Sequence, residues 1–147
     1  MNKSRYIFTA ENHLEIFEFI SEGPNGRIKK IVQYSETNTP DVYNLGFGDF
    51  NEKTGDIDDT VVTNNEDSQK VLATVAATVY AFTDKHPDAM IYATGTTEIR
   101  TRLYRIGITN NLKDIQRDFS VFGLRNELWE EFNTGIHYGA FLIKRKM

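Results

Sequence analysis

The feature that most constrains the fold of this chain is one long helical pattern in its middle, NNEDSQKVLATVAATVYAFTDKHP, which predicts a helix over about 66–86. Asn64 or Asn65 is a suitable N-cap, and Pro87 ends the pattern because proline disfavours a helical residue before it. Apolar residues recur three and four positions apart, as on the buried face of a helix: Val71, Leu72, Val75, Ala76, Val79 and Phe82. We therefore expect this helix to pack on a sheet.

Four strand-like runs precede the helix. HLEIFEFIS and RIKKIVQYS flank the turn sequence GPNG, and VYNLGFGDF and DIDDTVVT flank the turn NEKTG. In VYNLGFGDF, Tyr43, Leu45 and Phe47 share one face of the strand. Gly46 and Gly48 share the other face and predict the close approach of another segment, by default the long helix.

The rest of the chain alternates between the two kinds of structure. AMIYAT predicts a strand, TTEIRTRLYRI a helix over about 97–107, and NNLKDIQRDF a second short helix. VFGLR reads as a strand or loop, NELWEEF as a helical turn, and IHYGAFLIKRK as a final strand. Consecutive early strands joined by tight turns imply an antiparallel or mixed sheet with helices mainly on one face. The predicted fold class is α+β, a single domain over residues 1–147.

Composition narrows the classes of function. The 147 residues include no cysteine, which excludes a disulfide framework, a thiolate metal site and a cysteine nucleophile. Neither a signal peptide nor an apolar membrane span is evident, so we expect a cytoplasmic protein without membrane contact. A net charge of −4 argues against nucleic acid as the partner.

Charge is unevenly distributed along the chain. Residues 1–96 hold 8 Lys/Arg against 15 Asp/Glu, whereas residues 97–147 hold 9 against 6. The basic third could dock on the acidic remainder, in the same molecule or in a partner. Alternatively, each part simply solvates its own surface.

The segment GTTEIRTRLYR is the first candidate site. A strand, a turn and a helix N-terminus can present N–H groups and hydroxyls to a phosphate or carboxylate, and an arginine fork can bind the same anion. The ligand-binding candidates are Thr96, Thr97, Arg100, Arg102, Tyr104 and Arg105. The spaced glycines and lysine of a phosphate-binding loop are lacking.

Helical spacing separates these candidates. It predicts Ile99, Leu103 and Ile106 as the buried stripe, flanked on its two sides by Arg100 and Arg102, with Tyr104 and Arg105 towards solvent. In the structural alternative, Thr96 or Thr97 is only a helix cap. The arginines then pair with carboxylates near 56–59.

The acidic turn GDFNEKTGDIDDT is the second candidate site. The carboxylates of Asp56, Asp58 and Asp59 could gather a divalent cation such as Mg²⁺. A solvated hairpin, or a set of partners for the arginines, is the alternative. The three histidines are far apart in sequence, and no serine lies in a nucleophile-elbow pattern, so no catalytic set is recognisable.

The ordered segments YNLGFGD, IDD, VLATVAATVYAFTDKHP, GTTEIRTRLYR and GAFLIKRK resemble a family of uncharacterised small bacterial proteins defined only as a domain of unknown function. The resemblance spans about Tyr6 to Lys146. It implies a bacterial, single-domain, cytoplasmic protein. It brings no activity, cofactor or catalytic residue.

Three functional hypotheses remain. The first is a non-catalytic binding or protein-interaction module without a cofactor, such as one part of a toxin–antitoxin or phage-defence system, with a protein partner or a second copy. The second is a metal-assisted phosphodiesterase or nuclease, with the cation on Asp56, Asp58 and Asp59 and with Arg100 stabilising the developing charge. The third is a nucleotide- or anion-binding module that uses the Gly-Thr-Thr turn and the arginine-rich helix.

Overall fold

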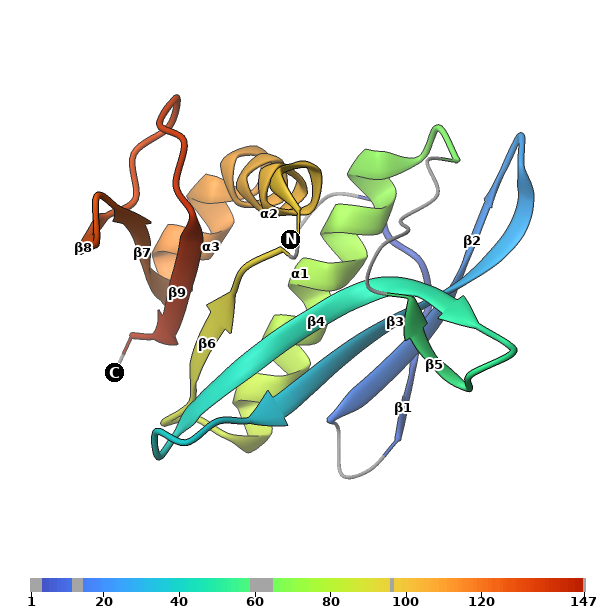
Figure 1. Cartoon of the computed structure of the whole chain (residues 1–147), viewed down its shortest axis with the longest axis horizontal. Helices are drawn as coiled ribbons and strands as arrows, with labels where there is room; N and C mark the ends of the chain where they lie inside the picture. The colour runs from blue at the N-terminus through green and yellow to red at the C-terminus, as the bar shows by residue number, and fades with distance from the viewer. Residues whose placement is uncertain (1–3, 12–14, 59–64, 96, 147) are drawn as a thin grey trace.

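The computed structural model describes residues 4–11, 15–58, 65–95 and 97–146, which form one mixed sheet with helices packed on one face (Figure 1). The predicted α+β class is therefore confirmed. The strands are β1 (Thr9–Glu11), β2 (Ile16–Gly23), β3 (Gly26–Glu36), β4 (Val42–Asn51), β5 (Asp56–Asp58), β6 (Met90–Ala93), β7 (Phe119–Arg125), β8 (Leu128–Glu131) and β9 (Ala140–Arg145). The helices are α1 (Ser68–Lys85), α2 (Glu98–Asn110) and α3 (Leu112–Asp118).

The sheet order is β1-β2-β3-β4-β6-β9-β7-β8, with β5 attached to β4. Only the β4–β6 pair is parallel among the described strands. The β2–β3 hairpin turns over GPNG as predicted, with Gly23 opposite Gly26. Gly26 has a φ of 87°, a left-handed conformation that costs glycine little because it has no Cβ.

Helix α1 is the core helix that the sequence predicts, and it lies across the sheet (Figure 1). Phe82 is fully buried, and its ring stacks on that of Tyr34 with a centroid distance of 4.2 Å. Burial raises the pKa of the Tyr34 hydroxyl, which shares a 2.8 Å hydrogen bond with Thr78 of α1. These contacts join α1 to the centre of β3.

The start of α1 differs from the prediction. The helix begins at Ser68, with Asp67 at the N-cap position, so Asn65 is not the cap; Asn64 lies outside the described residues. The buried Asn65 side chain instead binds the β2–β3 turn, accepting from Asn25 N at 2.7 Å and donating to Gly26 O at 2.9 Å. The Asn65 side chain, which the sequence pattern assigns to a helix cap, therefore forms a tertiary contact with the β2–β3 turn instead.

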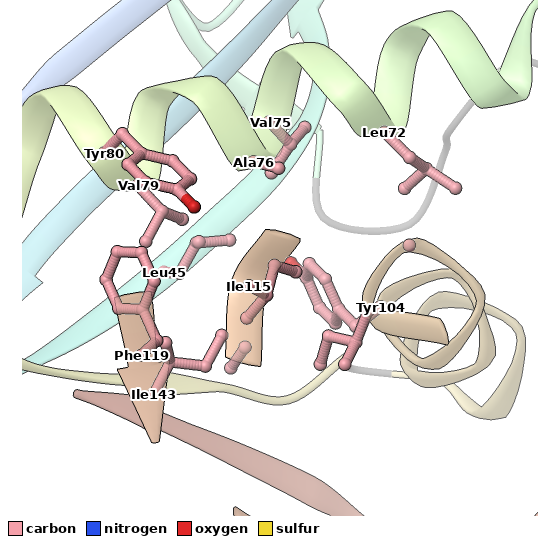
Figure 2. Close-up of a pocket in the computed structure, with 13 residues that line it drawn as sticks. Leu45, Leu72, Val75, Ala76, Val79, Tyr80, Tyr104, Ile115, Phe119 and Ile143 are labelled. Carbon is pink, nitrogen blue, oxygen red and sulfur yellow. The ribbon is translucent and has the colours of Figure 1, made fainter. Parts of the chain in front are cut away.

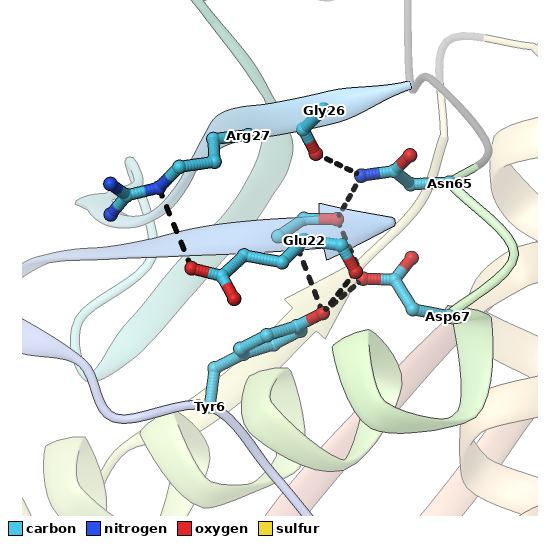
Figure 3. Close-up of polar contacts among 7 residues, drawn as sticks. Tyr6, Glu22, Gly26, Arg27, Asn65 and Asp67 are labelled. Atoms are coloured by element: carbon cyan, nitrogen blue, oxygen red, sulfur yellow. Dashed lines mark hydrogen bonds and ion pairs between the residues drawn. The ribbon is translucent and has the colours of Figure 1, made fainter. Parts of the chain in front are cut away.

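Asp67, at the start of α1, also joins the N-terminal segment to β2 (Figure 3). The Asp67 Oδ2 atom accepts hydrogen bonds from the Tyr6 hydroxyl and from Ser21 Oγ, both at 2.6 Å. Burial and the hydrogen bond to Asp67 raise the pKa of Tyr6. The polar groups in Figure 3 thus stabilise the junction between the N-terminal segment, β2 and α1.

The interpretation of NELWEEF as a helical turn is wrong, because Leu128–Glu131 forms strand β8 on the edge of the sheet. The hairpin from β7 turns through Asn126 and Glu127, whose φ values are 53° and 65°. Two such left-handed residues make a tight hairpin turn, but a glutamate is an unusual second residue there. Strand β1 also has no counterpart in the prediction.

No helix in the described part of the chain is both long and apolar enough to cross a membrane.

Candidate functional site

The turn from β6 into α2 depends on Gly95 and Thr97. A Cβ atom on Gly95 would lie 2.5 Å from both Arg100 Cβ and Thr101 N, so no larger residue fits without displacing the helix. Thr97 is the N-cap, and its side chain accepts a hydrogen bond from Arg100 N at 3.2 Å. The capping role of Thr97 is therefore confirmed, and α2 begins at Glu98 and continues to Asn110.

The buried face of α2 is not the predicted one. Arg100 and Tyr104 are each 7% exposed and Ile108 is 6% exposed, whereas Ile99 is 75% exposed. The stripe of Ile99, Leu103 and Ile106 is therefore wrong, as is the solvent-facing position of Tyr104. Gly107 contributes to this orientation, because a Cβ there would meet Leu72 of α1 at 3.2 Å. Ile99 therefore lies on the exposed side of α2.

The Arg100 side chain lies where β4 changes its partner strand from β6 to β5, a place that we call the sheet fork. Strand β4 pairs with β6 over Val42–Leu45 and with β5 over Asp49–Asn51, which leaves a gap at Gly46 and Gly48. The Arg100 Nη1 atom donates to the Asp58 carbonyl at 3.2 Å. A Cβ on Gly48 would lie 3.3 Å from Nη1 and 2.8 Å from the same carbonyl. The predicted close approach is present, but by β5 and the guanidinium group rather than by the long helix.

We expect Arg100→Ala to lower the free energy of unfolding by about 1–3 kcal/mol, because it removes a buried side chain and the donor of a partly buried carbonyl. Urea denaturation followed by circular dichroism measures the loss. The matched control is Arg102→Ala, an exposed arginine on the same helix, which should change stability by less than about 0.5 kcal/mol. Equal losses in the two variants would contradict a structural role for Arg100.

Tyr104 borders a small apolar cavity in the core (Figure 2). The cavity is about 50 Å³ and lies between α1, α2, α3 and the sheet. Small-molecule sites usually measure about 300–1,000 Å³, so we assign no ligand to it. Tyr104 therefore belongs to the packing of α2 rather than to a surface site.

A much larger open groove lies between the N-terminal half of α2 and the segment before β9, and we call it the α2–β9 groove. It encloses about 810 Å³. Its lining residues are Thr94, Gly95, Thr97, Glu98, Ile99, Thr101, Arg102, Arg105, His137, Tyr138 and Gly139. Thr94 Oγ1 donates to the Gly139 carbonyl at 2.8 Å and so joins the two sides of the groove.

Positive charge gathers in the α2–β9 groove. Arg105 Nη1 lies 2.9 Å from His137 Nδ1. A guanidinium group can only donate, so Nδ1 is the acceptor and the imidazole proton sits on Nε2. Within the described ranges, neither Arg102 nor Arg105 forms an ion pair. Among the described residues that line the groove, Glu98 is the one acidic residue.

The structure divides the predicted ligand-binding residues. Thr97, Arg102 and Arg105 line the α2–β9 groove, whereas Arg100 points into the sheet fork and Tyr104 into the core. Thr96 lies outside the described residues. His137 was missed because it is 32 residues from Arg105 in sequence, and no local pattern joins an exposed loop histidine to a helix.

The acidic turn has a different environment. The Asp56 carboxylate accepts from Ile57 N at 2.7 Å, and Asp58 lies opposite Asp49, which contacts Lys30 in a buried ion pair. Asp59 lies outside the described residues. The described part of the chain contains no group of three or more His, Asp or Glu that could hold a metal ion. The turn and α2 do meet, at the Arg100 contact, and cation binding stays a prediction.

Comparison with known protein families places the chain in a family of unknown function. The chain matches the family described as "Family of unknown function (DUF6934)" over residues 2–146, and it belongs to that family. The resemblance stated from the sequence segments is thereby confirmed. Searches of curated proteins and of solved structures give no significant match.

Proposed function

We propose that this protein is a binding module that holds a small anionic ligand in the α2–β9 groove. The guanidinium groups of Arg102 and Arg105 and the imidazole of His137 would contact the anion. The observation that carries the proposal is the hydrogen bond between Arg105 and His137 in a groove where neither arginine has a carboxylate partner among the described residues.

The chemistry of these groups suits a carboxylate or phosphate. Arginine presents donors in a planar fork that matches both anions, and charge-assisted hydrogen bonds are stronger than neutral ones. With Nδ1 accepting from Arg105, the Nε2–H of His137 is left to donate to a ligand. The groove volume of about 810 Å³ lies within the usual range for small-molecule sites.

The ligand should also have an apolar part. Ile99 lines the same groove and is 75% exposed, next to the polar side chains of Thr97 and Thr101. An anion with a hydrocarbon or ring portion would cover Ile99 while its charged end contacts the arginines. Bare phosphate should therefore bind more weakly than an organic anion of similar charge.

Isothermal titration calorimetry at low ionic strength tests the proposal with inorganic phosphate, pyrophosphate, citrate and a nucleoside monophosphate as probes. We expect at least one organic probe to bind. Arg105→Gln should weaken that binding by about tenfold or more, because a charge-assisted fork is lost. Arg105→Lys should restore only part of it, since lysine keeps the charge without the planar fork.

The matched control is Arg117→Gln, which removes an exposed arginine of α3 that lies outside the groove. It should leave both the affinity and the melting temperature unchanged. Binding that survives Arg102→Gln and Arg105→Gln together, or no heat with any probe, would refute the proposal. The two-component genetic system and the metal-assisted hydrolase have no further support in the described geometry and stay predictions.

A further inference from the structure

The three helices cover one face of the sheet and leave the other face of β6, β9, β7 and β8 uncovered (Figure 1). Side chains alternate along a strand, and directly paired residues share a face. Ile91, Ile143 and Val121 are paired across three strands and are buried on the helix side. Tyr92, Leu142 and Phe122 form the next cross-strand row and therefore point away from the helices.

The uncovered face is apolar over this half of the sheet. We call it the outer patch: Met90, Tyr92, Phe122, Leu124, Trp129 and Leu142. Trp129 is 43% exposed, and its ring packs edge-on against that of Tyr92, with 6.2 Å between the ring centroids. On the same face of β2 and β3, polar and apolar residues alternate: Gln33 and the ion pair of Glu18 with Lys29 lie beside Ile16, Ile20 and Ile31. A sheet face that meets only water normally carries mainly polar residues, so the apolar residues of the outer patch favour a covered face.

We infer that the outer patch is a self-association surface on which a second copy of this chain docks to form a two-fold symmetric dimer. The argument for a second copy is the placement of charge. Lys144 lies on β9 beside Leu142, and Glu131 lies on β8 opposite Phe122, so opposite charges flank the patch. Neither side chain forms an ion pair with another described residue.

In a two-fold symmetric dimer, the flanking charges of one copy lie near the opposite charges of the other. Two facing sheets pack about 10 Å apart with their strands roughly aligned. A two-fold axis that runs along β7 between the sheets exchanges the positions of β9 and β8. Lys144 of each copy then lies near Glu131 of the other, about two residues along the strand, while the apolar rows cover one another. A two-fold interface requires such self-complementarity of a single patch.

Sedimentation equilibrium of the full chain tests the inference. We expect the wild-type protein to dimerise. Lys144→Glu and Glu131→Lys should each weaken the dimer by about tenfold or more, because each places like charges opposite one another twice. An equimolar mixture of the two variants should regain wild-type affinity, since in the mixed dimer both contacts join opposite charges. Leu142→Asp, in the patch itself, should give a monomer.

The matched control is Gln33→Glu, a charge added to the same sheet face outside the outer patch, and it should leave the dimer unchanged. Circular dichroism and melting temperature confirm that each variant folds. A wild-type chain that is monomeric up to millimolar concentration would overturn the inference, as would single variants that dimerise normally or a mixture that does not recover. Because no outer-patch residue lines the α2–β9 groove, these outcomes leave the ligand proposal unaffected.

Discussion

Replacing Phe82 with alanine should lower the free energy of unfolding by about 3–5 kcal/mol. Phe82 is fully buried, stacks on Tyr34 at 4.2 Å and meets the edge of Tyr43 at 4.9 Å between ring centroids. The substitution removes this apolar area and leaves a cavity that the two neighbouring rings can fill only in part. Urea denaturation monitored by circular dichroism measures the change.

Two control variants test whether the loss of stability in Phe82→Ala comes from the buried cavity. Phe82→Leu should cost less than the alanine substitution, because a smaller cavity remains. Leu128→Ala removes a side chain that is 72% exposed, and its effect should stay within about 0.5 kcal/mol. If Phe82→Ala costs no more than Leu128→Ala, the packing of α1 on β3 described above is incorrect.

Asp49→Ala should lower the free energy of unfolding by a comparable amount, about 3–5 kcal/mol. Asp49 forms an ion pair with Lys30, whose side chain is only 1% exposed. Removing one partner of a buried ion pair is strongly destabilising, because the other charge remains in a poorly solvated place. The same urea titration, run at neutral pH, measures the loss.

The control for Asp49 is a double substitution, Lys30→Met with Asp49→Leu. Both charges are then replaced by apolar side chains of similar size, and such replacements are often neutral or stabilising. We expect the double variant to recover most of the stability that Asp49→Ala loses. A double variant as unstable as the single one would show that packing at this position, rather than the buried charge, determines the loss.

Local patterns predicted the elements whose contacts are themselves local. The 3.6-residue period of α1, the turn over GPNG and the alternation of Tyr43, Leu45 and Phe47 all appear as expected. In each case the pattern is carried by residues close together in the sequence. The NELWEEF segment shows the limit, because its helical composition is overridden by pairing of β8 with β7.

The candidate site was predictable only in part. The sequence indicated that α2 carries an anion-binding surface candidate, and the structure places Thr97, Arg102 and Arg105 together in the α2–β9 groove. The orientation of α2 was not predictable from apolar spacing. Arg100 is buried because the fork beside Gly48 offers it the Asp58 carbonyl, and that carbonyl belongs to a strand 42 residues away in sequence.

By itself, then, the sequence determined an α+β chain with one core helix, an arginine-rich second helix and membership of one protein family. Only the tertiary structure decided which arginines face solvent, that His137 joins Arg105, and that half of one sheet face is left apolar and uncovered. The physical reason is the range of the interactions. Helical period and turn chemistry act over a few residues, whereas burial, ion pairing and strand order depend on segments that meet only in the folded chain.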